Sequence, residues 1–472
     1  MFRAIFDWIF GRRTAAPQPA PVPPSIDRLN RQAPLRAPSP LSTVATAPSS
    51  AAPTASATAN EIGPTFLSRE AVLNRKEKIA GYQFMLQEST RNRIRNSSRK
   101  VHQLYAEVLV TSLARAEIGK LLGPRMAFID VPDSFLDHPC LGQLSASNTV
   151  LVLTALADAG APELDTLLRN VRRLRAIGFR IGLPDPLSEP RFAALMPEAD
   201  VVMTRAPQVD AESALLLSAQ IVEYAPQATL LVRDLPGLED FRFCFQLGGG
   251  LFQGPFISSR ENWQDRNLGP NVARLAMLVG KLRTSVETDE IVELLKQDAA
   301  VAVRLLRYIN SAANGLSEQV SSIDRALALL GRDKLYRWLV LLMCSSDDSG
   351  GRASAVLETA LVRARMMELL GKEKSAAERE ALFLTGLLSL IDIVLQVPME
   401  RAIASLAVSP AIEAAVLRGE GPHAAHLTLA QACESMDAEA IRNAAQRCNV
   451  QPEVAAAAHL EALAWALSIQ QE

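Results

Sequence analysis

Histidine and aspartate side chains gathered around a divalent metal would allow the chain to activate water for phosphate hydrolysis. His423 and His426 have the i, i+3 spacing that suits zinc, but they follow Gly421-Pro422 and no Cys-x-x-Cys motif lies nearby. None of the five histidines is followed by aspartate: His102, His138, His423, His426 and His459. We therefore interpret them as ordinary surface or capping residues, and we expect neither a metal nor another cofactor.

The overall composition predicts a multidomain globular protein. The chain has 472 residues, of which 49% are apolar, so two or three domains can each bury a core. Lys and Arg number 49 against 51 Asp and Glu, which gives no general attraction to nucleic acid. Five widely spaced cysteines are typical of reduced core thiols, and the apolar runs are shorter than the ~20 residues that cross a bilayer. We expect a cytoplasmic location and no nucleic-acid partner.

Between residues 63 and 259, short β-rich runs alternate with helical stretches, the pattern of a β/α barrel. Helices are expected over residues 93–122, 162–177, 211–224 and 238–246. The expected strands cover residues 66–68, 79–86, 126–130, 149–154, 180–183, 201–204, 229–233 and 251–253. In such barrels chemistry takes place where the strands end, so the strand ends are the candidate site.

Residues 298–342 predict three consecutive helices. Asp298 is a candidate N-cap, and Asn314-Gly315 provides a left-handed stop. Ser321 or Ser322 caps the second helix, which ends at Gly331. The apolar spacing then continues to Leu342, and further helices are expected over residues 353–371, 375–390, 397–405, 410–418, 426–447 and 451–470. This half of the chain is therefore expected to be an all-helical bundle.

The N-terminus has two parts of different character. Residues 1–13 form an amphipathic stub that places Phe2, Ile5, Phe6 and Ile9 on one helical face. It is either a tether that docks a partner or binds a membrane weakly, or a frayed terminus. Residues 14–60 hold ten of the 28 prolines among Ala, Ser and Thr, which predicts a disordered linker.

The C-terminal half resembles HDOD domains in two adjoining motifs, LLRYINSAANGL and SSIDRALALLG. The segments TALVRARMMELLG, LFLTGLLSLID and LRGEGP extend this resemblance to bacterial EAL-HDOD signalling proteins over residues 260–472. The resemblance implies a helical module that is similar in fold to metal-dependent phosphohydrolases but does not hydrolyse phosphate.

Residues 61–259 are similar to the EAL domain, a barrel family that cleaves cyclic di-GMP, in REAVLNRKEKIAGYQFMLQ, LRNVRRLRAIGFRIGLPD and LFQGPF. The resemblance implies a site in which carboxylates and an Asn hold one or two divalent cations while a Lys polarises water. The signature Glu of the family falls on Gln83, its nearby Arg on Gln87, and its Asn on Asp130. A further Glu falls on Val152, which cannot coordinate a metal.

The later strand ends also depart from the family's pattern. The paired aspartates fall on Pro184 and Asp185, and the catalytic Lys falls on Met203. The next Asp and Glu fall on Arg205 and Arg233, whereas the final Gln is retained as Gln253. Possible oxygen ligands remain at Asp130, Asp185, Asp200 and Asp234, but two guanidinium groups at the same rim would repel a cation. We therefore predict a degenerate barrel, a pseudoenzyme without a catalytic or metal site.

Polar residues on the first of the three helices are candidates for a partner-binding patch: Arg304, Arg307, Asn310, Ser311 and Asn314. The competing interpretation is helix capping and solvated charge. Tyr308 and Trp338 are expected in the core.

Together these features predict a cytoplasmic signalling scaffold that acts through protein contacts in a cyclic-di-GMP-linked pathway, with motility or biofilm formation as the output by analogy. Two alternatives stay open: a cyclic-di-GMP phosphodiesterase with a rearranged site, and a nucleotide receptor that does not hydrolyse its ligand. The partner and the oligomeric state do not follow from the sequence.

Overall fold

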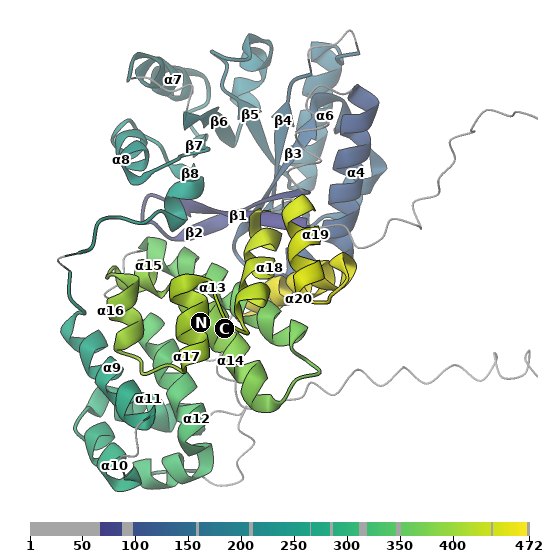
Figure 1. Ribbon diagram of the computed structural model, residues 1–472. Coiled ribbons are helices and arrows are strands. Elements are labelled where there is room, and N and C mark those ends of the chain that lie inside the picture. The colour runs from purple at the N-terminus through teal and green to yellow at the C-terminus, as the bar shows by residue number, and fades with distance from the viewer. Residues whose placement is uncertain are drawn as a thin grey trace, which may run out of the picture.

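The computed structural model describes residues 67–469 apart from 87–97, 157–159, 207–210, 265, 284–286, 311–318, 346–350 and 436–437. An α/β barrel forms the N-terminal part, and a helical bundle follows it (Figure 1). The predicted stub and linker at residues 1–13 and 14–60 lie outside the described residues.

Eight strands close the barrel in chain order, as the sequence predicts. Strand β1 runs antiparallel to both neighbours, β2 and β8, and the other neighbouring pairs are parallel. The short turn between β1 and β2 explains this direction, because a tight turn can join only antiparallel strands. The strands are β1 (Leu67–Asn74), β2 (Ile79–Leu86), β3 (Met126–Pro132), β4 (Thr149–Thr154), β5 (Arg180–Pro184), β6 (Val201–Arg205), β7 (Thr229–Arg233) and β8 (Leu251–Gln253).

The prediction for the first strand, residues 66–68, is wrong: β1 is eight residues long. The charged residues Arg69 and Glu70 interrupt its apolar sequence, so the predicted strand ended at residue 68. Both charged groups instead have partners in other elements: Arg69 pairs with Glu358 of the helical part, and Glu70 accepts a hydrogen bond from Gln253 of β8. Tertiary contacts therefore determine this strand.

The helices around the barrel are α4 (Arg99–Arg115), α5 (Ile118–Leu121), α6 (Leu164–Ile177), α7 (Ala211–Tyr224) and α8 (Leu238–Gln246). The single helix predicted over residues 93–122 is divided, because Glu117 adopts a left-handed φ of 49° between α4 and α5. The other three predicted helices agree within two residues at either end.

The helical part comprises α9 (Pro270–Arg283), α10 (Thr288–Lys296), α11 (Ala299–Ile309), α12 (Ile323–Cys344), α13 (Gly351–Leu370), α14 (Ala376–Leu388), α15 (Ile391–Leu395), α16 (Met399–Ala404), α17 (Pro410–Glu413) with a π-helical turn at Ala414–Arg418, α18 (Ala424–Ser435), α19 (Ala438–Arg447) and α20 (Pro452–Ile469). The side chain of Asp298 caps α11 by accepting from the Val301 N–H at 3.1 Å, and Ser322 caps α12. Gly331 has a φ of 73°, so α12 contains the predicted break.

Two expectations for this region have different outcomes. Helix α11 ends at Ile309, before the predicted stop at Asn314-Gly315, because Asn310 binds the backbone of Val320 instead of continuing the helix. Tyr308 and Trp338 are core residues as expected, and their rings stack with centroids 5.9 Å apart.

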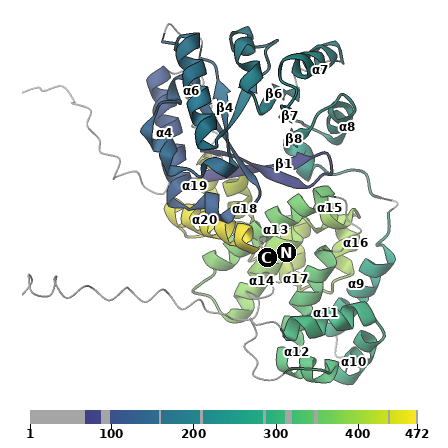
Figure 2. The ribbon, with the colours of Figure 1, turned by 180° about the vertical axis from the view of Figure 1, so that it is seen from behind.

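The two parts are joined through a buried ionic network, which we call the Glu358 network: Glu358 of α13, Arg69 of β1, Tyr82 of β2, and Arg125. The hydroxyl oxygen of Tyr82 lies 2.6 and 2.7 Å from the two Glu358 carboxylate oxygens, and Arg125 Nη1 donates to the same hydroxyl at 2.6 Å. Glu358 is 1% exposed. Figures 1 and 2 show α13 beneath β1 and β2, so the helical part is packed against this edge of the barrel.

The connection after the barrel adds polar contacts between the two parts. Arg260 donates to the Asp392 carboxylate at 2.5 Å, and Arg352 donates to the carbonyl oxygens of Phe256 and Ser259. The barrel and the bundle are therefore in direct contact. Among the described residues, no helix combines the length and hydropathy needed to span a bilayer.

Candidate functional site

Side chains pointing into the barrel form two layers. The lower layer, which we call the apolar layer, includes Val72, Phe128, Val150 and Met203, all of them buried. Because side chains alternate along a strand, the inward positions two residues after Phe128 and Met203 carry Asp130 and Arg205. Strand β1 runs in the opposite direction, so Glu70, two residues before Val72, lies at the same end. The same alternation places Gln83, Arg233 and Gln253 at this end. We call Glu70, Gln83, Asp130, Arg233 and Gln253 the polar layer.

The polar layer lies at the carboxyl end of the parallel strands, where the sequence predicts the site. Arg205 pairs in register with Arg233, Pro184 with Met203, and Asp130 with Val152. The structure therefore brings together the predicted site positions that it describes, except for Asp200, which lies at the opposite end of the barrel, and Gln87 lies outside the described residues. Whether these positions form a degenerate site stays a prediction.

Arg233 is the centre of the polar layer. Its side chain is 3% exposed, and its Nη1 donates to Asp130 Oδ1 at 2.7 Å while its Nη2 donates to Gln83 Oε1. The guanidinium of Arg233 thus links β7 to β2 and β3 across the barrel end. A charge-assisted pair of this kind is stronger than a neutral hydrogen bond.

The remaining carboxylates at this end also have partners. Asp185 is buried, and its two oxygens accept from the Leu187 N–H at 2.8 Å and from the Thr204 hydroxyl at 3.1 Å. Asp234 pairs with Arg205. Asp200, a predicted oxygen ligand, precedes β6 at the opposite end, where it accepts from the Ile181 N–H. It does not belong to the site.

The divalent cations that the EAL resemblance implies do not fit the side chains as they are arranged. Asp130 is bonded by a guanidinium, and a divalent ion within about 4 Å of that group would be repelled by several kcal/mol at an effective dielectric of about 20. Within the residues that the structure describes, no group of three or more His, Cys, Asp and Glu side chains is arranged to hold a metal.

Sequence reasoning missed Glu70. Its carboxylate accepts a hydrogen bond from Gln253, and it pairs in register with Gln83 on the neighbouring strand. The alternation of Glu70 and Val72 along one strand could have indicated an inward position, but the predicted strand ended at residue 68.

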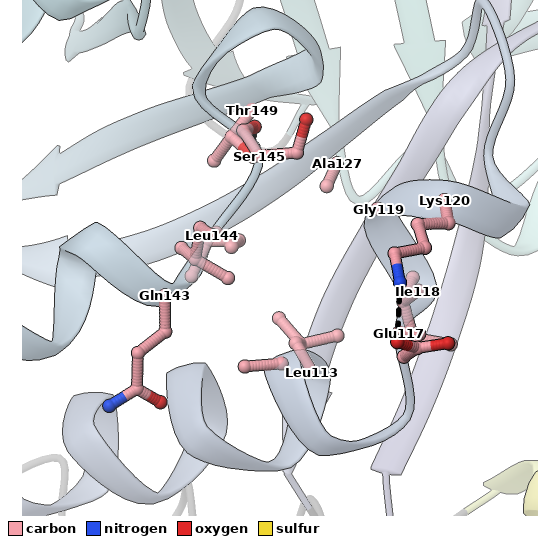
Figure 3. A pocket seen from close by; sticks show the side chains of 12 residues that line it. Leu113, Glu117, Ile118, Gly119, Lys120, Ala127, Gln143, Leu144, Ser145 and Thr149 are labelled. Carbon is pink, nitrogen blue, oxygen red and sulfur yellow. Dashed lines mark hydrogen bonds and ion pairs between the residues drawn. The ribbon is translucent and has the colours of Figure 1, made fainter.

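A hollow of about 340 Å³ lies at the other end of the barrel, where β3 and β4 begin (Figure 3). Ala127 and Thr149 line it from the strands, and Leu113 and Ile118 line it from α4 and α5. The Lys120 ammonium pairs with the Glu117 carboxylate at its rim. None of the polar-layer residues contributes to this hollow, so it is separate from the candidate site.

The interpretation of the histidines as surface residues is wrong for three of them, because helices of the bundle cover His423, His426 and His459. His138 does cap a turn, since its Nδ1 accepts from the Cys140 N–H at 3.3 Å. Burial lowers the pKa of His423 and that of His426, and it lowers the pKa of His459 to about 4. Four of the five cysteines are buried thiols, and Cys448 is half-buried.

We expect His459 to make the protein less stable in mild acid. Its pKa is about 4 when folded, against 6.5 as the ordinary value, so the unfolded chain binds the additional proton between these pH values. Arg69 opposes the charged form and Glu434 favours it. The free energy of unfolding should therefore fall by roughly 3 kcal/mol from this group as pH drops from 6.5 to 4. Urea titrations across this range should show a shallower pH slope for His459→Gln; an identical slope would contradict the assignment.

The candidate partner-binding residues on α11 and directly after it have different roles. Asn310 has a structural role, because its amide binds the Leu306 and Val320 carbonyls and the Val320 N–H. Arg304 and Arg307 are exposed, so their role in partner binding stays a prediction, and Ser311 and Asn314 lie outside the described residues.

Comparison with known proteins identifies the helical part. Residues 270–412 match the HDOD domain family. The chain is 24% identical to the uncharacterized protein YuxH of Bacillus subtilis over 413 residues, which cover 85% of this chain and 97% of YuxH. It is 23% identical to the cyclic di-GMP phosphodiesterase CdgJ of Vibrio cholerae over 378 residues, covering 79% of this chain and 85% of CdgJ.

Among solved structures, the Bacillus subtilis YkuI protein, with an EAL domain and in complex with cyclic di-GMP and calcium, covers 51% of this chain. The match includes 73% of the YkuI chain at 14% identity and a TM-score of 0.35. A standalone EAL protein from Vibrio cholerae matches 41% of this chain and 90% of its own, at 13% identity and a TM-score of 0.33.

These comparisons overturn the prediction that the protein is a pseudoenzyme. CdgJ, which resembles this chain across most of both lengths, is named as a phosphodiesterase. That prediction rested on the replacement of the metal-binding and catalytic side chains of the EAL family by other residue types. The structure shows that carboxylates at Asp130 and Asp185 and cations at Arg205 and Arg233 nevertheless occupy the carboxyl end of the barrel.

Proposed function

We propose that this protein is a cyclic di-GMP phosphodiesterase with a rearranged site at the polar layer. The premise is its EAL-HDOD architecture, in which a barrel precedes an HDOD domain. The similarity to CdgJ, which extends over both parts of the chain, carries this proposal. The helical part would pass the state of the barrel to a protein partner through the Glu358 network.

The side chains at the barrel end have suitable chemistry for a phosphodiester. Hydrolysis adds water to phosphorus and expels one ester oxygen, and the negative charge on the phosphoryl oxygens must be stabilised. Arg205 and Arg233, which are register neighbours, offer guanidinium groups that match phosphate geometry. Asp130 and Asp185 offer carboxylates that can orient a water molecule or accept its proton.

The test is incubation of the purified full-length chain with cyclic di-GMP in Mg²⁺, in Mn²⁺ and in EDTA, with the linear product measured by chromatography. Asp130→Ala and Asp185→Ala are each expected to lower turnover about 100-fold or more, as for the loss of a general acid–base group. Glu239→Gln, which changes an exposed carboxylate on α8, is the matched control and should retain turnover.

Circular dichroism of each variant separates loss of chemistry from loss of folding. Absence of both turnover and nucleotide binding in all three buffers would overturn the proposal. Tight binding without turnover would overturn its hydrolytic part and would make the barrel a receptor.

A further inference from the structure

We propose that the guanidinium of Arg233 is the resident cation of the barrel and holds a cyclic dinucleotide phosphate without a divalent metal. This inference rests on the proposed function for its ligand. Arg233 occupies an inward position on β7, above the apolar layer, and both of its terminal nitrogens bind groups on other strands. Its positive charge is thus fixed at the barrel end by the fold.

Two buried polar atoms on adjacent strands have no hydrogen-bond partner among the described residues. One is Nε of Arg233, a donor, and the other is Oε1 of Gln253, an acceptor. Val232 pairs with Phe252 in the parallel β7–β8 ladder, so the residues that follow, Arg233 and Gln253, are neighbours on adjacent strands. Buried polar groups are normally satisfied, and a ligand that carries both an acceptor and a donor would satisfy these two atoms.

A cyclic dinucleotide of guanine carries both. Its phosphate oxygens accept hydrogen bonds from guanidinium groups, and its guanine N–H and ribose hydroxyl groups can donate to an amide oxygen. Gln253 is held in place for this role because its amide nitrogen donates to Glu70. A hydrogen-bond partner for each of the two orphaned atoms is therefore present in one ligand.

The second phosphate of such a ligand also has a candidate partner. Arg205 pairs in register with Arg233 on the adjacent strand, and its side chain is 34% exposed against 3% for Arg233. Asp234 pairs with Arg205 at the rim. Arg205 is thus the outer guanidinium and Arg233 the inner one, an arrangement suited to a ligand with two phosphates.

Calorimetric titration of the full-length protein with cyclic di-GMP tests the proposal. The dissociation constant is expected to change less than about twofold between Mg²⁺ and EDTA, whereas Arg233→Met should weaken binding at least 50-fold, in line with loss of a charge-assisted contact. Arg172→Met is the matched control, because Arg172 is exposed on α6 and pairs with Glu198 away from the polar layer. Its dissociation constant should equal that of the wild type.

A second variant covers the risk that Arg233→Met alone does not fold, since it leaves Asp130 without its guanidinium partner. Asp130→Asn combined with Arg233→Met removes both charges, so this double variant should fold. Its dissociation constant for the nucleotide should again be at least 50-fold higher than that of the wild type. Wild-type affinity in this double variant would overturn the role of Arg233.

Titration with Mn²⁺ alone, followed by electron paramagnetic resonance, separates this proposal from the proposed function. Wild-type protein should show no stoichiometric Mn²⁺ site. Nucleotide binding that EDTA abolishes would overturn the resident-cation proposal while leaving the proposed function intact. If no nucleotide binds in either buffer, the proposed function and this inference both fail. A stoichiometric Mn²⁺ site in the wild-type protein would overturn this inference alone.

Discussion

Glu358→Ala is expected to lower the free energy of unfolding by about 3–5 kcal/mol, the cost of breaking a buried ion pair by removing one partner. The substitution would leave the Arg69 guanidinium, 9% exposed, without its carboxylate. It would also remove the acceptor that lies 2.6 Å from the Tyr82 hydroxyl. Since Arg69 and Tyr82 belong to the barrel and Glu358 to α13, the loss should weaken the contact between the two parts.

Urea unfolding followed by far-UV circular dichroism measures this effect, and limited proteolysis should cut the connection at residues 259–269 sooner in the variant. Glu378→Gln is a control, because Glu378 is an exposed capping residue of α14 and its loss costs about 1 kcal/mol or less. Arg69→Met combined with Glu358→Leu should recover much of the lost stability, because apolar replacement of a whole buried pair is often tolerated. A Glu358→Ala protein as stable as the wild type would contradict a structural role for the Glu358 network.

Gly386→Ala is expected to destabilise the helical part by about 2–3 kcal/mol, within the usual cost of overpacking a core. A methyl group on Gly386 would lie 2.5 Å from Cα and 2.6 Å from the backbone nitrogen of Ala364. These atoms belong to the backbone of α13, so no side-chain rotation relieves the contact and α13 and α14 must move apart. Their packing is central to the bundle, because α13 also contacts α18 and α20.

Gly280→Ala is the matched control for this prediction. Gly280 lies inside α9, and an added methyl group would meet only the Ser405 carbonyl oxygen at 3.7 Å, an ordinary contact. Alanine has the higher helix propensity, so this variant should be more stable than the wild type by about 0.5–1 kcal/mol. Thermal unfolding of both variants gives the comparison; equal midpoints would show that α13 and α14 are not closely packed at Gly386.

Most strands and helices of the barrel and of the helical part could be predicted from the sequence, because the patterns that indicate them are local. Strand β4 and helix α8 have their predicted bounds, since an apolar run or a helical period is contained in a few consecutive residues. The caps at Asp298 and Ser322 and the break at Gly331 are equally local, because each depends on one side chain and the next turn of backbone. The resemblance to EAL and HDOD proteins rests on runs of this kind.

Tertiary structure alone determined the character of the site and of the interface. Arg233 and Asp130 are 103 residues apart in the chain, and no local pattern indicates that they form a pair inside the barrel. The sequence shows an arginine where the family has a carboxylate; the fold shows which groups that arginine binds and which atoms it leaves unpaired. The same reason applies to Arg69, Glu70 and His459, whose partners and burial come from strands and helices that meet only when the chain closes on itself.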